Sequence, residues 1–264
     1  MSSPGTGEFW EIPTLFEDEH LLALNKPSRL LVSAEAAHPE RPNLMQLLHR
    51  GIERGVPWAK QRRLDYLMNA HRLDFDASGV ILLAKTKIAF TALADQFTSE
   101  QPHRTYSALV RGVPPAETFE TDAKLAPHPL QMGVIRVDAR EGKRSRTTFA
   151  VRERFDGFLL LEGRPSPDRP DQLSVHLKYL RLPVVGAEIY GGRPLFLSTL
   201  KRDYQPKPDQ EERPLMGRAA LHMEQVSVTH PASGATVTMQ APWPKDLSAS
   251  IKYLRKYAPG AAVA

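Results

Sequence analysis

The side chains with the clearest potential for chemistry lie together in residues 70–85, which read AHRLDFDASGVILLAK. His71, Arg72, Asp74 and Asp76 place an imidazole, a guanidinium and two carboxylates within six positions. A carboxylate can attack the C1′ carbon of a sugar, as in retaining glycosidases. Charges at the end of a buried segment are costly unless they are paired or take part in function. This stretch is therefore the first candidate for an active site.

An apolar run directly after these polar residues predicts the element that positions them. Val80–Ala84 is short, β-branched at its start and bounded by Gly79 and Lys85. Such a run is typical of a fully buried strand. Asp74 is then expected just before the start of that strand.

The rest of the chain predicts interspersed strands and helices. Further strands are expected at residues 15–19, 20–24, 104–110, 147–154, 157–161, 225–229 and 235–240. Helices are expected at residues 43–54 with Asn43 as the cap, and at 87–100, 172–182 and 247–257. Pro-rich residues 165–170 and 206–214 are expected to form loops. Because tight turns join adjacent strands, the pattern indicates an α+β fold with a mixed, mainly antiparallel sheet and flanking helices.

Composition and charge narrow the class of protein. The 264 residues contain no cysteine, which excludes disulfides, Cys-ligated zinc and thiol catalysis. No apolar run reaches membrane-spanning length, and the N-terminus lacks the pattern of a signal peptide, so we expect a cytoplasmic protein without a membrane partner. The net charge of +5 favours a polyanionic partner such as RNA or DNA. A single catalytic domain is expected over residues 9–258, between tails at 1–8 and 259–264, and the protein is expected to be a monomer.

Residues 71–85 resemble the HRLD-x-x-[TS]-SG-hydrophobic-A-K motif of the RluA-type pseudouridine synthases. Ala77 stands where that family commonly has Thr. The resemblance extends over residues 14–257 and implies one mixed sheet with a central catalytic cleft. It also implies that Asp74 is the catalytic nucleophile, and that His71 and Arg72 help to hold a flipped nucleotide and the RNA backbone.

A second segment, HRTYSALVRG at residues 103–112, resembles the K-x-Y-x-A-x-V-x-G strand of the same family. The resemblance implies that Tyr106 stacks on the target base and assists the removal of the C5 proton, and that Arg104 contacts phosphate. Residues 25–32 resemble a further motif, NKP-x-G-L-L-V, which we interpret as architectural. Arg29 stands there where the family usually has Gly, so this turn is expected to differ.

The chain departs from the family motif T-G-R-[TS]-H-Q-[IL]-R-V-H. Gly163 and Arg164 match its start, a Pro-rich insertion follows, and residues 171–176 then read DQLSVH. By the same resemblance, Ser174 replaces the Arg that pairs with the catalytic Asp in the family. Arg164 or Arg169 is a candidate to take over that pairing, and Arg164 is also a candidate RNA-binding residue.

The sequence therefore predicts an RNA pseudouridine synthase that acts on structured rRNA or tRNA with Asp74 as nucleophile, without a metal, an organic cofactor or an N-terminal accessory RNA-binding domain. The alternative is a catalytically impaired, synthase-like RNA-binding protein, because Ser174 has replaced the active-site Arg. A third hypothesis is a carboxylate-based nucleoside or glycoside hydrolase. That chemistry needs a second carboxylate, and Asp76 is a poor candidate because a turn begins there.

Overall fold

The computed structural model describes residues 9–204 and 211–260. The expected N-terminal tail at residues 1–8, the end of the expected C-terminal tail and part of the predicted loop 206–214 lie outside these residues. The chain divides into two compact units. The first unit comprises Met1–Arg104 and Met223–Pro242, and the second comprises Thr105–His222 and Trp243–Ala264.

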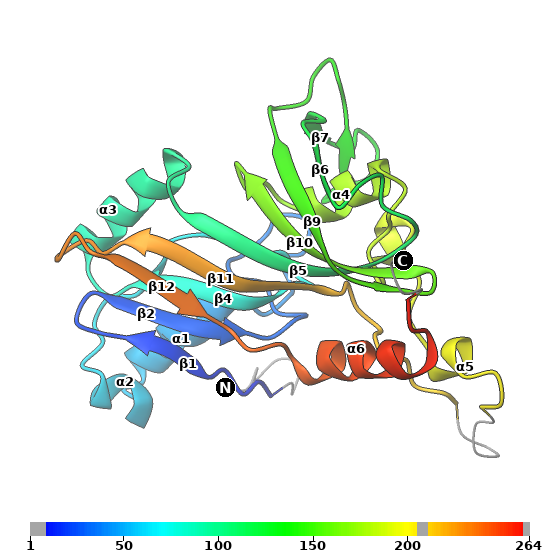
Figure 1. Ribbon diagram of the computed structural model, residues 1–264. Coiled ribbons are helices and arrows are strands. Elements are labelled where there is room, and N and C mark those ends of the chain that lie inside the picture. Colours follow the sequence, from blue (N-terminus) through cyan, green and yellow to red (C-terminus); the bar gives the residue numbers. More distant parts are fainter. Residues whose placement is uncertain (1–8, 205–210, 261–264) are drawn as a thin grey trace. The chain divides into compact units, whose positions relative to one another are not determined.

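The first unit is built on a sheet in which β4 lies between β2 and β11 (Figure 1). Its strands are β1 (Thr14–Glu17), β2 (Leu21–Lys26), β3 (Met68–Asn69), β4 (Ser78–Ala84), most of β11 (Leu221–Thr229), and β12 (Thr236–Gln240). β1 pairs with β2, β2 and β3 pair with β4, and β11 pairs with β12, all in antiparallel orientation. The predicted buried strand is confirmed, because every residue of β4 is buried.

Three helices accompany this sheet, namely α1 (Leu44–Glu53), α2 (Pro57–Gln61) and α3 (Lys87–Thr98). The predicted cap at Asn43 is confirmed, since its side chain accepts a hydrogen bond from the Gln46 N–H at 2.9 Å. Thr86 caps α3 in the same way through the Ala89 N–H at 3.1 Å. Such caps satisfy N–H groups that the first turn of a helix leaves without intrahelical partners.

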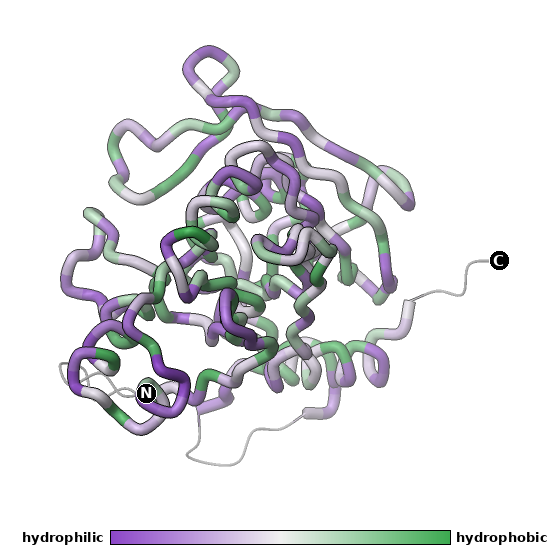
Figure 2. Tube along the Cα trace, turned by 90° about the vertical axis from the view of Figure 1, so that its left-hand side faces the viewer, coloured by the Kyte–Doolittle hydropathy of each residue, from purple (hydrophilic) through white to green (hydrophobic). Residues whose placement is uncertain are grey.

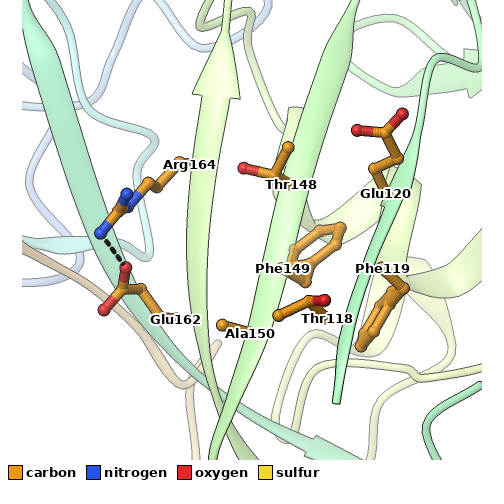
Figure 3. A pocket seen from close by; sticks show the side chains of 8 residues that line it. All are labelled: Thr118, Phe119, Glu120, Thr148, Phe149, Ala150, Glu162 and Arg164. Atoms are coloured by element: carbon orange, nitrogen blue, oxygen red, sulfur yellow. Dashed lines mark ion pairs between the residues drawn. The ribbon is translucent and has the colours of Figure 1, made fainter. Parts of the chain in front are cut away.

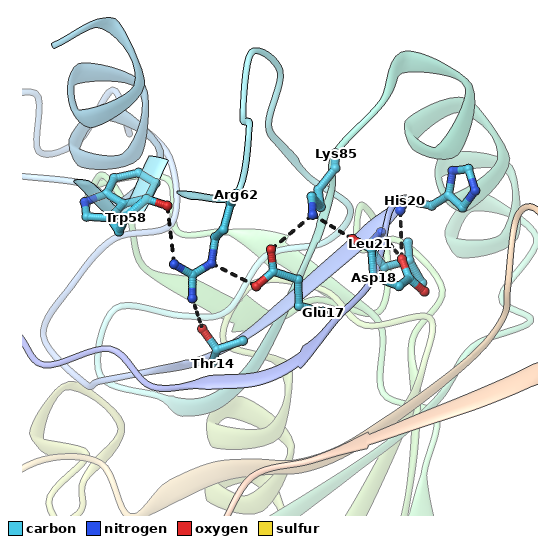
Figure 4. Close-up of polar contacts among 8 residues, drawn as sticks. All are labelled: Thr14, Glu17, Asp18, His20, Leu21, Trp58, Arg62 and Lys85. Carbon is cyan, nitrogen blue, oxygen red and sulfur yellow. Dashed lines mark hydrogen bonds and ion pairs between the residues drawn. The ribbon is translucent and has the colours of Figure 1, made fainter. Parts of the chain in front are cut away.

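Charged side chains fix the edge of this unit (Figure 4). Glu17 accepts a hydrogen bond from Arg62 at 2.8 Å and one from Lys85 at 3.0 Å. Lys85 also donates to the Asp18 carbonyl at 2.6 Å. The contacts join β1 to the end of α2 and to the residue after β4, so the far end of the buried strand is held by ion pairs.

The second unit contains a sheet in the order β5-β10-β9-β6 and a separate β7-β8 pair (Figure 1). These strands are most of β5 (His103–Arg111), β6 (Thr118–Thr121), β7 (Leu125–Pro127), β8 (Ile135–Val137), β9 (Arg146–Phe155) and β10 (Phe158–Ser166), and the pairs that they form with one another are antiparallel. Its helices are α4 (Gln172–Tyr179), the 3₁₀ helix η1 (Glu188–Tyr190), α5 (Leu197–Leu200) and α6 (Lys245–Tyr257). Both units together confirm the predicted α+β class with a mainly antiparallel arrangement of strands.

In the second unit, the loop predicted at Pro165 and the predicted end of a helix at residue 182 are wrong. Pro165 was expected in a loop but belongs to β10, opposite Thr147 of β9. The pairing of β10 with β5 ends at Gly163, so Pro165 lies where its missing N–H removes no bond to β5. The helix predicted to reach residue 182 ends at Tyr179, because the backbone turns to a left-handed conformation at Arg181.

Hydrophilic and hydrophobic stretches are interspersed along the described chain (Figure 2). Apolar residues thus occur in every part of the described chain and can contribute to the buried core. None of the helices in the described part of the chain is long and apolar enough to cross a membrane.

Candidate active site

Asp74 lies on a tight turn that leads directly into β4. The Ala77 N–H donates to the Asp74 carbonyl at 3.2 Å, and β4 begins at Ser78. The Asp74 side chain is half-buried, whereas Ala77 and Ser78 are buried. A partly covered carboxylate on a turn that is anchored by a buried strand can meet a ligand from solvent while its backbone stays fixed.

The NKP segment, residues 25–32, is hydrogen-bonded to the turn that carries Asp74. The Arg29 N–H donates to the Phe75 carbonyl at 2.7 Å, so the segment is bonded directly to the Asp74 turn. Arg29 has a φ of 58°, the left-handed conformation that glycine adopts most easily. The Lys26 side chain is fully buried and donates to the carbonyls of Pro27 at 2.9 Å and Leu30 at 2.8 Å. These hydrogen bonds give the segment a structural role, in agreement with its interpretation as architectural.

His71 is a packed and uncharged residue. Its Nε2 accepts a hydrogen bond from the Leu82 N–H at 3.1 Å, so the ring proton belongs on Nδ1, which faces the Arg72 carbonyl at 3.3 Å. The ring stacks on Phe97 of α3 with centroids 5.1 Å apart. Burial and the nearby Arg104 charge lower the pKa of His71 to about 3. His71 therefore fixes the polar loop to β4 and leaves little of its surface for RNA.

The two predicted RNA-binding arginines of this unit differ in exposure. Arg72 is exposed and forms an ion pair with Glu35. Arg104 is only 8% exposed, and its guanidinium lies over the Phe97 ring at 5.4 Å from the centroid. Both the His71 ring and the Arg104 guanidinium therefore contact the Phe97 ring. Their proximity explains why the charge of Arg104 lowers the pKa of His71.

Tyr106 lies in the second unit on β5, directly opposite Gly163 of β10. The ring is 5% exposed, and its hydroxyl donates to Oδ2 of Asp168 at 2.8 Å. A Cβ atom at position 163 would come within 2.9 Å of Leu173 on α4, so Gly163 lets α4 pack closely on this face of the sheet.

Arg164 does not share the face of Tyr106. Residues directly opposite on paired strands lie on the same face and neighbours along a strand alternate, so Arg164 faces the other side from Gly163 and Tyr106. Arg164 is 66% exposed and pairs with Glu162 at 2.6 Å, as Figure 3 shows. Both line a shallow surface pocket of about 430 Å³ across β10, β9 and β6.

Ser174 lies on α4, and Arg169 directly follows Asp168, whose carboxylate contacts Tyr106. Ser174 is buried on α4 with 4% exposure. The Arg169 Nε donates to the Arg144 carbonyl at 2.7 Å, which ties the Pro-rich loop to the start of β9. Within residues 9–204 and 211–260, no three His, Asp or Glu side chains are grouped so that they could hold a metal ion.

Comparison with known proteins identifies the family. The family model described as RNA pseudouridylate synthase matches residues 20–179 of this sequence. "Ribosomal large subunit pseudouridine synthase D" of Xylella fastidiosa is 36% identical over 253 residues, which cover 92% of this chain and 69% of that protein. "Ribosomal large subunit pseudouridine synthase C" of Escherichia coli K12 is 31% identical over 243 residues, covering 91% and 69% respectively.

The fold agrees with this assignment. The solved structure of human RNA pseudouridylate synthase domain containing 4 matches with a TM-score of 0.69 at 22% identity, covering 92% of each chain. The chain belongs to the RNA pseudouridylate synthase family. As a member of this family, it is an RNA-modifying isomerase.

Three residues that the structure places around the predicted ones, Phe97, Lys26 and Asp168, carry no clear signal in the sequence. Phe97 was recognised as part of a helix but not as the platform for His71 and Arg104. Lys26 lay in a recognised motif, but nothing in its spacing indicated full burial. Asp168 lies in an insertion, and its contact with Tyr106 spans 62 positions of the chain, which no local pattern reveals.

Proposed function

We propose that the protein converts uridine to pseudouridine in ribosomal RNA with Asp74 as the nucleophile. The observation that carries the proposal is the position of Asp74, half-buried on a turn bonded to the NKP segment and leading into a fully buried strand. Ribosomal RNA is preferred to tRNA because the relatives at 36% and 31% identity are named as enzymes of the large ribosomal subunit.

In the proposed reaction, Asp74 and Tyr106 each take part in a chemical step. The Asp74 carboxylate attacks C1′ of the flipped nucleotide, and the N1–C1′ bond breaks with its electron pair leaving on the uracil. The uracil turns, C5 bonds to C1′, and the bond to Asp74 breaks. C5 then loses a proton with the help of Tyr106, and N1 gains one from water. Substrate and product are isomers, so no atom is gained or lost overall.

The arginines are proposed to hold the RNA. Arg72 is exposed and can exchange its ion pair with Glu35 for a phosphate. Arg104 contributes positive charge next to the loop that carries Asp74, and His71 acts through the loop that it fixes. Arg164 can contact the RNA only if the RNA chain also passes over the face of β6, β9 and β10 that points away from Tyr106. We propose that the protein acts as a monomer in the cytoplasm.

A second candidate function is RNA binding without turnover. The observation that favours it is Ser174, a buried hydroxyl where the family has a cation for the catalytic Asp. Loss of a nearby cation raises the free energy of an ionised carboxylate. Arg164 faces away from Tyr106, which leaves Arg169 as the better candidate for a replacement.

The test is to treat unmodified transcripts of large-subunit rRNA and of tRNA from the source organism with the purified protein, and to map pseudouridine by chemical labelling and primer extension. New pseudouridine in the rRNA alone is the expected result. Modification of tRNA alone would contradict the proposed substrate. Tight rRNA binding without new pseudouridine would support the second candidate.

A further inference from the structure

The Pro-rich loop of the second unit places a carboxylate on the Tyr106 hydroxyl. Tyr106 donates to Oδ2 of Asp168 at 2.8 Å, while the ring is 5% exposed. Buried tyrosine hydroxyls need a hydrogen-bond partner, but a neutral carbonyl would satisfy that need. A carboxylate is a more costly partner to bring into a half-buried position, and it can form a stronger hydrogen bond than a neutral acceptor. A functional role explains this choice of partner.

The loop that carries Asp168 is held in place on both sides. Before it, Ser166 is still paired with Arg146 of β9. After it, the Arg169 N–H donates to Oε1 of Gln172 at 3.1 Å, and the Gln172 side chain donates to the Arg146 carbonyl at 2.9 Å. The Asp168 carboxylate therefore has a fixed direction towards the phenol, as pre-organised catalytic groups require.

We propose that Asp168 is a positioning residue that orients the Tyr106 hydroxyl and accepts its proton during removal of the C5 proton. This inference rests on the proposed function. In the step, the C5–H bond breaks and its electron pair forms the C5=C6 bond, while the C6=N1 pair moves to N1. The C5 proton passes to the Tyr106 oxygen as the phenol proton passes to Oδ2 of Asp168. N1 is protonated by water, and Asp168 then returns its proton to water.

The same unit offers a matched control. The Tyr190 hydroxyl donates to Oδ2 of Asp171 at 2.8 Å, the same contact at the same distance only three positions along the chain. Tyr190 also accepts a hydrogen bond from the Ile135 N–H at 3.2 Å, so it serves the packing of the β7-β8 pair. Asp171→Asn should thus weaken a Tyr–Asp contact without affecting the chemistry.

The experiment measures single-turnover isomerisation of rRNA that carries either hydrogen or deuterium at uridine C5. In Asp168→Asn we expect a rate about tenfold or more below wild type, because an assisted proton transfer contributes at least that much. We also expect a larger C5 deuterium isotope effect, because proton removal becomes slower relative to the other steps. Asp171→Asn should keep the wild-type isotope effect. In a Tyr106→Phe background, Asp168→Asn should have no further effect.

An active wild type with an unchanged rate and isotope effect in Asp168→Asn would overturn the inference and leave the proposed function standing. A slower Asp168→Asn with an unchanged isotope effect would also overturn it, since only folding or binding would then be affected. No turnover by the wild type would overturn the proposed function and, with it, this step.

Discussion

At the scale of single residues, polar groups near the candidate site are fixed by specific partners. The His71 ring is bonded to the backbone of β4 and stacked on Phe97. Lys26 binds two backbone carbonyls, and the Tyr106 hydroxyl binds Asp168. Side chains that are held in this way lose little freedom when a substrate binds, which favours a chemical role for the groups they surround.

His71 makes the stability of the protein sensitive to acid. Its pKa is about 3 in the folded state against 6.5 for an ordinary histidine, so between these pH values only the unfolded state takes up the proton. The free energy of unfolding should therefore fall as the pH drops from about 6.5 towards 3, by up to about 1.4 kcal/mol per pH unit. Denaturant titrations of wild type and His71→Gln at several pH values test this.

His71→Gln should remove this part of the pH dependence, whereas substitution of the exposed His103 by Gln should retain it. Equal slopes in wild type and His71→Gln would show that the buried imidazole is not responsible.

At the scale of elements, close packing of strands sets where the candidate residues lie. Gly79 has a φ of 119°, and a Cβ atom there would come within 2.1 Å of the Met223 carbonyl oxygen on β11. The glycine thus permits the close approach of β11 to the start of β4, four to five positions after Asp74. Gly163 has the same function for α4 and β10 in the second unit.

Gly79→Ala should lower the free energy of unfolding by about 3 kcal/mol or more, the sum of left-handed strain and a backbone clash. Gly234 is the matched control, since its φ is 71° but a Cβ atom there meets nothing within 4 Å. Gly234→Ala should cost only about 1–2 kcal/mol. Denaturant unfolding of both variants provides the measurement, and equal losses would contradict the role assigned to Met223.

At the scale of the whole molecule, each of the two compact units contains some of the residues to which we assign a role. Asp74, His71, Arg72 and Arg104 belong to the first unit, and Tyr106 with Asp168 belongs to the second. Arg104 and Tyr106 are separated by one residue on β5, so this single strand carries residues of both groups. The net charge of +5 suits a polyanionic substrate.

Much of this arrangement could be predicted from the sequence. The apolar run after Gly79, the cap at Asn43 and the hairpin around residues 229–236 depend on local patterns, and the structure confirms them. The partners of Tyr106 and the orientation of Arg164 could not be predicted. Both depend on how β10 pairs with β5 and β9, which no local pattern indicates. The Pro-rich insertion also interrupts the family motif that begins at Gly163 and Arg164.

The role of Asp74 as the nucleophile is tested by tritium release from rRNA labelled with ³H at uridine C5, comparing wild type with Asp74→Asn and Asp76→Asn. Both carboxylates lie in the same short loop and are half-buried, so Asp76→Asn controls for charge and local folding. Release by wild type and Asp76→Asn but not by Asp74→Asn is the predicted result. Undiminished release by Asp74→Asn would contradict the account.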